Sequence, residues 1–250
     1  MPSISDAVKD DSFMGLFIGR PGKGKSIGAA SFPKPMYIFD LDGRIKPVAR
    51  FFGDEDITFD TYLPQDFSKF YAKLKELVLN CKYKTVILDS YTALADMLIT
   101  YSINLRGNDN RKTDKGVISM TEISDFNAET QGLQSTVAML RTIKCQYKIM
   151  NAHMLLTEYY DLTNQKTRIL KSVLTAGKKV SEKVPAYFDN VWYFYTKDSL
   201  NASSPPDYCV RTVPREDDNI KSAINVSAEL IFSKSNSNPK GSLFKLIEGK

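Results

Sequence analysis

The sequence is poor in the residues that build metal clusters and disulfide frameworks. It contains a single histidine, His153, and three cysteines, Cys81, Cys145 and Cys209, among 250 residues. The cysteines are scattered and show no C-x-x-C spacing, which argues against zinc and disulfides and for a reducing compartment. One histidine also excludes most metal-cluster chemistry and most catalytic triads that need this side chain.

Long apolar runs and a strong excess of charge are also missing. No window of about 18 apolar residues exists, so we expect no membrane-spanning helix and no membrane partner. The polar, acidic start of the chain, residues 1–13, is not a secretory signal, which favours the cytoplasm. The net charge of +5 is compatible with a nucleic-acid partner without arguing for one. Hydrophobic and charged fractions of 42% and 25% are typical of a soluble globular protein.

The most informative stretch is GRPGKGKS, which fits the pattern G-x-x-x-x-G-K-[ST] of a phosphate-binding P-loop, or Walker A motif. Glycines allow backbone N–H groups to surround phosphate oxygens, the lysine reaches the β- and γ-phosphates, and the hydroxyl binds Mg²⁺. The context agrees, because an apolar run of strand length, 13–18, precedes the motif and a short apolar segment, 26–32, follows it. The predicted ATP-binding residues are Gly19, Arg20, Pro21, Gly22, Lys23, Gly24, Lys25 and Ser26.

Two later strands are predicted to end in acids. Residues 36–43 read as a buried strand that ends in Asp40 and Asp42, which period-2 geometry would point to the same face. Such a pair suits orienting or deprotonating a water, although both acids could instead cap an Asp-Gly turn. Residues 84–90 form an apolar strand ending in Asp89, the Walker B arrangement that delivers a carboxylate to Mg²⁺.

His153 lies in a further predicted strand, 148–161. A histidine in an apolar strand is usually a satisfied core residue. Here the polar position in an apolar run after the P-loop also suits contact with the γ-phosphate of a bound nucleotide.

Two basic segments are candidates for binding a phosphate backbone. The first is the polar loop 105–117, and the second is the stretch 162–190, which contains a predicted edge strand or hairpin arm. Either can equally be an ordinary solvated surface. The candidate DNA-binding residues are Arg106, Arg111, Lys112, Lys115, Lys166, Arg168 and Lys171.

The remaining pattern predicts helices over 64–79, 92–104 and 124–144 and a short strand over 56–62. An aromatic strand, 189–196, is expected to pair with 207–214 as a hairpin. The Ser/Asn-rich segment 233–250 is expected to be partly disordered or a contact arm. The predicted organisation is a polar lead-in over 1–12, one domain over 13–232 and this basic tail.

Taken in order, the P-loop, the helix broken by F-P-K-P, the D-x-D-G strand, the V-I-L-D-S strand and the A-H strand form an ordered set. Together with T-A-G-K and V-P-A-Y-F-D-N-V-W further on, the set resembles phage-encoded AAA/RecA-like nucleotide-binding proteins. Some of these are RecA-like single-strand annealing proteins of phage recombination. The resemblance covers about residues 13–232. It implies an α/β RecA-like P-loop NTPase core, a mostly parallel central sheet flanked by helices, and a C-terminal β-hairpin extension.

The resemblance also implies ATP and Mg²⁺ as ligands, with ATP at the interfaces of a ring or filament of copies. Lys25 and Ser26 then take the P-loop roles, and Asp89 the metal-binding role. Asp42 falls where the water-activating acid stands, although Glu is more common there, and His153 matches the γ-phosphate sensor. Lys221 resembles the trans-acting finger of a K-x-R motif whose arginine is absent here. The loops 105–117 and 157–178 correspond to DNA-binding loops.

Three functions follow as hypotheses. The first is an ATP- and Mg²⁺-dependent ATPase that binds single-stranded DNA in phage recombination, annealing or replication, in the host cytoplasm, with a single-strand DNA-binding protein as a further candidate partner. The second is a weakly hydrolysing assembly factor or helicase loader. The third is a small-metabolite P-loop kinase, which usually has an arginine-rich lid, whereas 162–183 is lysine-rich with Arg168 as its only arginine.

Overall fold

The computed structural model describes residues 12–106, 121–162, 165–175, 178–197, 206–215, 218–232 and 242–248. The strands are β1 Phe13–Gly19, β2 Met36–Asp40, β3 Ile57–Thr61, β4 Thr85–Asp89, β5 Tyr147–Asp161, β6 Lys166–Val173, β7 Asn190–Lys197, β8 Asp207–Arg211 and β9 Glu229–Phe232. The α-helices are α2 Lys25–Ala30, α3 Lys46–Phe52, α4 Phe67–Leu79, α5 Tyr91–Arg106, α6 Ile123–Thr142, α7 Lys178–Lys183 and α8 Ser242–Glu248. Two 3₁₀ turns, Pro64–Asp66 and Val184–Tyr187, precede α4 and follow α7.

The strands form one sheet in the order β3-β2-β4-β5-β1-β7-β8-β9, with β6 paired to β5 outside this path. The six strands from β3 to β7 are parallel, whereas β8, β9 and β6 are antiparallel to their neighbours. Helical crossovers between parallel strands cover both faces of the sheet, as this topology requires. The predicted α/β P-loop NTPase fold with a C-terminal β-hairpin is confirmed.

Alternation along the strands divides the core into two layers. Leu16 on β1 and Met150 on β5 face one layer with α4, α5 and α6, while Phe17 and Ile149 face the other with α2, α3 and α8. All seven residues of β1 are buried, because the strand is covered on both faces. Trp192 on β7 is also fully buried and stacks on Phe17, which rules out a role for its ring in stacking on bases. The P-loop strand is therefore held rigidly at the centre of the molecule.

Most predicted elements are confirmed to within a few residues. The strands expected at 36–43, 56–62, 84–90, 148–161, 189–196 and 207–214 appear as β2, β3, β4, β5, β7 and β8, and the three long helices as α4, α5 and α6. The edge strand expected in the basic stretch is β6, which pairs with β5 from Met154↔Val173 to Asp161↔Lys166.

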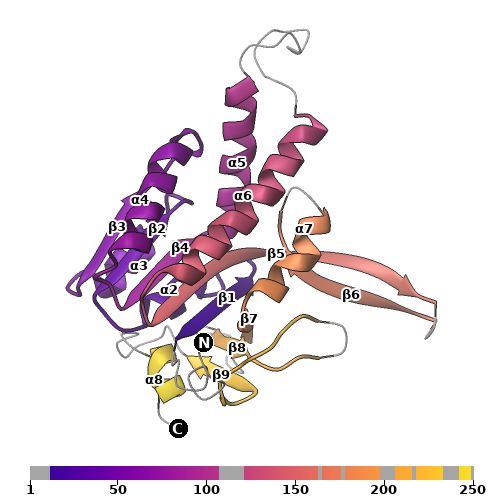
Figure 1. Cartoon of the computed structure of the whole chain (residues 1–250). Coiled ribbons are helices and arrows are strands. Elements are labelled where there is room, and N and C mark those ends of the chain that lie inside the picture. Colours follow the sequence, from indigo (N-terminus) through magenta and orange to yellow (C-terminus); the bar gives the residue numbers. More distant parts are fainter. Residues whose placement is uncertain are drawn as a thin grey trace, which may run out of the picture.

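Two parts extend beyond the sheet. Figure 1 shows α5 and α6 side by side with their far ends above the sheet, and the outer parts of β5 and β6 forming a long two-stranded ribbon. None of the described helices is both long and apolar enough to cross a bilayer.

Helix α8 was not foreseen from the sequence. It lies in the segment 233–250, which the sequence led us to regard as a basic tail, yet Leu243 is fully buried and Phe244 is 7% exposed. Both side chains join the layer of α2, and the backbone N–H of Phe244 donates to the hydroxyl of Ser31 at the end of that helix. The last described helix is therefore part of the core beneath the P-loop.

This packing leads to a stability prediction. Replacing Leu243 with alanine should cost about 2–5 kcal/mol of unfolding free energy, because a fully buried leucine leaves a cavity. Leu246→Ala on the same helix is the matched control, since Leu246 is 39% exposed and should lose less than about 1 kcal/mol. Urea unfolding measures both, and equal small losses would show that α8 contributes no core packing.

Candidate nucleotide-binding site

The P-loop links β1 to α2 and forms the wall of a cavity of about 260 Å³. Gly24 occupies the N-cap of α2 with φ of 88°, a left-handed conformation that other residues rarely adopt. A Cβ at this position would also lie 2.9 Å from the Tyr208 ring. Of the predicted loop residues, the six from Pro21 to Ser26 line the cavity, whereas Gly19 ends β1 and the Arg20 carbonyl turns toward Lys25. The sequence therefore needs glycine at 24 both for its backbone angle and for space.

Lys25 is held inside its own loop. Its ammonium donates to the carbonyls of Gly19 at 2.9 Å and Arg20 at 3.1 Å, and the residue is 6% exposed. Burial lowers the pKa of Lys25 to about 8, although Asp89 and Asp42 act in the opposite direction. The ammonium of the neighbouring Lys23 does not bond to the loop carbonyls and instead donates to the hydroxyl of Thr196 at 2.7 Å. Lys25 is thus the loop cation placed to meet a phosphate.

The strand order brings His153 to the P-loop. Strand β5 lies between β1 and β4, with His153 in register with Gly19 and Asn151 in register with both Phe17 and Asp89. The backbone N–H of His153 donates to the hydroxyl of Thr92, and its ring reaches into the cavity. Strand β5, inserted between the P-loop strand and the Asp89 strand, therefore places its polar residues beside the P-loop and Asp89.

Asp42 is fixed by two partners. Its Oδ1 accepts a hydrogen bond of 3.0 Å from Ser90, and its Oδ2 lies 3.5 Å from Nε2 of His153. Burial raises the pKa of Asp42, but the hydrogen bonds from His153 and Ser90 outweigh it, and the pKa lies below the ordinary 3.8. The carboxylate therefore stays ionised at neutral pH and keeps one orientation in the cavity.

The expectation that Asp40 and Asp42 act as a pair is wrong. Strand β2 ends at Asp40, so period-2 geometry does not extend to Asp42. Asp40 is 3% exposed and accepts hydrogen bonds from the backbone of Arg44 and the hydroxyl of Thr61. Asp40 thus holds the turn, as the alternative interpretation had it, and only Asp42 lines the cavity.

The donor set beside the P-loop fits Mg²⁺. Ser26 and Asp89 line the same cavity, burial raises the pKa of Asp89, and a hydrogen bond from Ser26 partly offsets this. The buried amide of Asn151, opposite Asp89, makes no hydrogen bond of good geometry to a described residue. Two protein oxygens suit Mg²⁺, which fills its remaining positions with water and phosphate, and a bound water would satisfy the amide. No group of three or more His, Cys, Asp or Glu side chains that could hold a metal ion occurs in the described ranges, at this cavity or away from it.

Other predicted residues lie outside this cavity. Lys221 is exposed and its backbone forms a bridge with Val191 on β7, beside Leu16 rather than beside the P-loop. Lys171 lies 3.8 Å from Asp218 and above the ring of Tyr193. Lys166 and Arg168 are on β6, and Arg106 ends α5, whereas Arg111, Lys112 and Lys115 lie outside the described residues.

The cavity also contains residues that sequence reasoning missed. Arg44 and Pro47 line it after the β2 turn, and Asn151 lies behind Asp89. Arg44 follows the D-x-D-G stretch directly, so its place after a strand end was a usable signal. Asn151 precedes His153 by two residues and therefore points to the same face of the sheet, which is also a visible pattern.

A parallel sheet with a P-loop after its central strand and an aspartate on a nearby strand end defines a P-loop nucleoside triphosphatase fold. The model of the AAA domain family matches residues 12–217, and the chain belongs to this family. The sequence has no match among curated proteins.

Similar solved structures are distant. One is the Legionella pneumophila ATPase DotB, at 10% identity and a TM-score of 0.22, with 76% of this chain and 52% of that chain covered. Another is the GDP-bound signal recognition particle receptor SRb of Chaetomium thermophilum, at 11% identity and a TM-score of 0.14, with 57% and 91% covered. The chain spans about half the length of DotB, and likenesses this distant carry no functional argument.

The pKa of Lys25 gives a pH-dependent prediction for nucleotide binding. With a pKa of about 8, Lys25 in the free protein is largely neutral at pH 8.5, whereas bound phosphate favours its charged form. ATP binding should therefore take up a larger fraction of a proton at pH 8.5 than at pH 7. Calorimetry in buffers of different ionisation enthalpy measures this uptake. Lys23→Met should leave it unchanged, and equal uptake at both pH values would contradict the assignment.

Proposed function

We propose that the protein is an ATP- and Mg²⁺-dependent ATPase of RecA-like type that binds single-stranded DNA in phage recombination, annealing or replication. The observation that carries the ATPase part is the convergence on one cavity of five side chains from the P-loop, the turn after β2, the end of β4 and the middle of β5, namely Lys25, Ser26, Asp42, Asp89 and His153. These side chains are far apart in the sequence, and such a set has little use in a purely structural role.

The geometry suggests a division of labour for ATP hydrolysis. Lys25 would leave its loop carbonyls for the β- and γ-phosphates, and Ser26 and Asp89 would hold Mg²⁺, which supplies charge neutralisation when bound. Asp42 would accept the proton of the attacking water, because it is ionised and oriented by Ser90 and His153. His153 would contact the γ-phosphate from the adjacent strand β5, where it is in register with Gly19.

A second copy of the chain would complete the site. Lys221 is exposed and does not line the cavity of its own chain, so it can reach a nucleotide only on a neighbouring copy. This supports the proposal of a ring or filament with ATP at subunit interfaces. A mass measurement with and without ATP tests it, and a monomer under both conditions would contradict it.

The DNA part is supported by the ribbon of β5 and β6 in Figure 1. Tyr159 and Tyr160 near its end are 38% and 57% exposed, and Lys166 is exposed on the paired strand. Aromatic rings for bases and cations for phosphates are the combination that single-strand binders use. Lys171 is partly committed to Asp218 and Tyr193, so it is a weaker candidate.

A salt titration tests this ribbon. Lys166→Ala should flatten the slope of log affinity for single-stranded DNA against log salt by about 0.7, the value for one lost phosphate contact. Tyr160→Ala should weaken binding without changing the slope, because stacking involves no counterion release. Lys69→Ala is the matched control, since Lys69 is exposed on α4 and paired with Asp66. Identical slopes for Lys166→Ala and Lys69→Ala would remove the ribbon from the DNA site.

A weakly hydrolysing assembly factor is the second candidate, and the site offers one reason for it. Both oxygens of Asp42 already have partners, and aspartate is shorter than glutamate, so its reach toward a water is limited. This candidate predicts that ATP changes the oligomeric state while turnover stays at background with DNA present. Transfer of phosphate to a small acceptor would instead support a kinase.

A further inference from the structure

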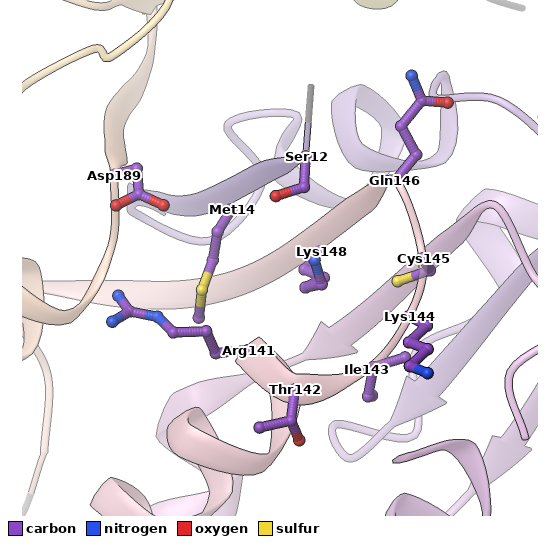
Figure 2. A pocket seen from close by; sticks show the side chains of 10 residues that line it. All are labelled: Ser12, Met14, Arg141, Thr142, Ile143, Lys144, Cys145, Gln146, Lys148 and Asp189. Atoms are coloured by element: carbon purple, nitrogen blue, oxygen red, sulfur yellow. The ribbon is translucent and has the colours of Figure 1, made fainter. Parts of the chain in front are cut away.

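A second cavity lies at the opposite end of the central strands from the P-loop. Its volume is about 760 Å³, and it is formed by the starts of β1 and β5 and the end of α6. Figure 2 shows the side chains around it, with Lys148 near the centre and Arg141 and Lys144 on the α6 side. None of these residues belongs to the nucleotide site.

Lys148 is the unusual member. It lies on β5 between Met14 and Val86 of the neighbouring strands, in the register of the apolar core, and is only 5% exposed. No hydrogen bond or ion pair joins its ammonium to another residue in the part of the chain that the structure describes. The stem of Lys148 is buried, whereas its ammonium is not enclosed by protein atoms and opens into the cavity, where a ligand can reach it.

The surroundings of Lys148 are positive. Arg141, at the last turn of α6, uses part of its guanidinium to donate to the carbonyl of Tyr187 and retains further N–H donors. Lys144 follows the helix, and Asp189 is the one carboxylate in the lining. The end of α6 adds only about half a negative charge. Together with the charge of Asp189, this does not balance the three positive charges of Lys148, Arg141 and Lys144. The cavity therefore carries net positive charge.

We propose that this cavity binds an oxyanion, the phosphate or carboxylate group of a small molecule, through Lys148. An ammonium held in a partly desolvated site forms strong charge-assisted bonds to such a group, and Arg141 and Lys144 would contact it from the α6 side. The volume falls within the range of about 300–1,000 Å³ found for small-molecule sites. The site is separate from the P-loop and does not depend on the function proposed for it.

Thermal unfolding tests the proposal, in the Lys25→Met background so that phosphate at the P-loop does not contribute. Inorganic phosphate and citrate are titrated in separate arms at constant ionic strength, to distinguish the two kinds of oxyanion. At least one of the two anions should raise the unfolding temperature of the Lys25→Met protein by about 2 °C or more beyond the rise that it causes in the Lys25→Met/Lys148→Met double variant. General salting-out would stabilise both proteins equally. Equal shifts in both proteins, for both anions, would overturn the proposal.

Two further measurements exclude a merely structural lysine. Lys69→Met, which removes one exposed cation, should keep the full anion response. Crystals of the full chain soaked in tungstate should show an anomalous peak for tungsten within about 4.5 Å of the Lys148 ammonium, the distance at which a tungstate oxygen accepts a hydrogen bond from it. Absence of this density would overturn the proposal even if Lys148→Met did not fold.

Discussion

Lys25→Ala should reduce ATP turnover by at least about 100-fold, because it removes the cation that stabilises charge on the transferred phosphoryl group. The ammonium of Lys25 is already positioned at the P-loop by the Gly19 and Arg20 carbonyls, so no other side chain in the loop can replace it without moving. ATP affinity should fall as well, since the lysine contacts phosphates in both ground and transition states. Steady-state phosphate release and nucleotide titration measure the two effects.

Lys23→Ala is the matched control for Lys25→Ala. It removes the same charge from the same loop, but its ammonium is bonded to Thr196 rather than to the loop carbonyls. Turnover should stay within a few-fold of the wild-type value. Similar losses in both variants would mean that general positive charge, rather than the position of Lys25, supports the activity.

Asp42→Asn should strongly reduce turnover while leaving ATP binding in place. The amide keeps the size of the carboxylate and can still bond Ser90, but it cannot accept the proton of a water, so the rate should fall by about 100- to 10,000-fold. Because the pKa of Asp42 is depressed, Asp42 stays ionised as pH falls. Protonation of Asp42 should therefore reduce the wild-type turnover only below pH 3.8, its ordinary pKa. If turnover in Asp42→Asn stays near wild type, another group activates the water.

Asp40→Asn separates structure from chemistry two residues away. Asp40 holds the turn through Arg44 and Thr61, so its amide variant should lose about 1–2 kcal/mol of unfolding free energy while retaining turnover within a few-fold. Asp42→Asn should show the reverse pattern. A loss of activity in Asp40→Asn without a loss of stability would restore the paired-acid interpretation.

The nucleotide site was largely readable because its signals are local. Gly19–Ser26 follows a buried strand and opens a helix, and Asp89 and His153 stand at positions that parallel strands bring to one edge. Once the P-loop fixes that edge, period-2 alternation predicts which side chains reach it. The same reasoning failed for Asp40 because the strand ended earlier than the pattern suggested, and a turn obeys no such period.

Features that depend on distant packing were not readable. The apolar pair Leu243 and Phe244 is too short to reveal a helix in a Ser/Asn-rich segment, and its burial against α2 follows from tertiary contact alone. Lys148 looked like an ordinary residue at the start of a strand, since its burial depends on how α6 ends above it. Local patterns indicate which elements form, but not what covers them.

ATP hydrolysis by the full chain with Mg²⁺, measured with and without single-stranded DNA, tests the proposed function most directly. We expect turnover above that of Lys25→Ala, increased by DNA, with the increase lost in Asp42→Asn. Turnover no higher than that of Lys25→Ala, with and without DNA, would contradict the proposal of a DNA-dependent ATPase at this site.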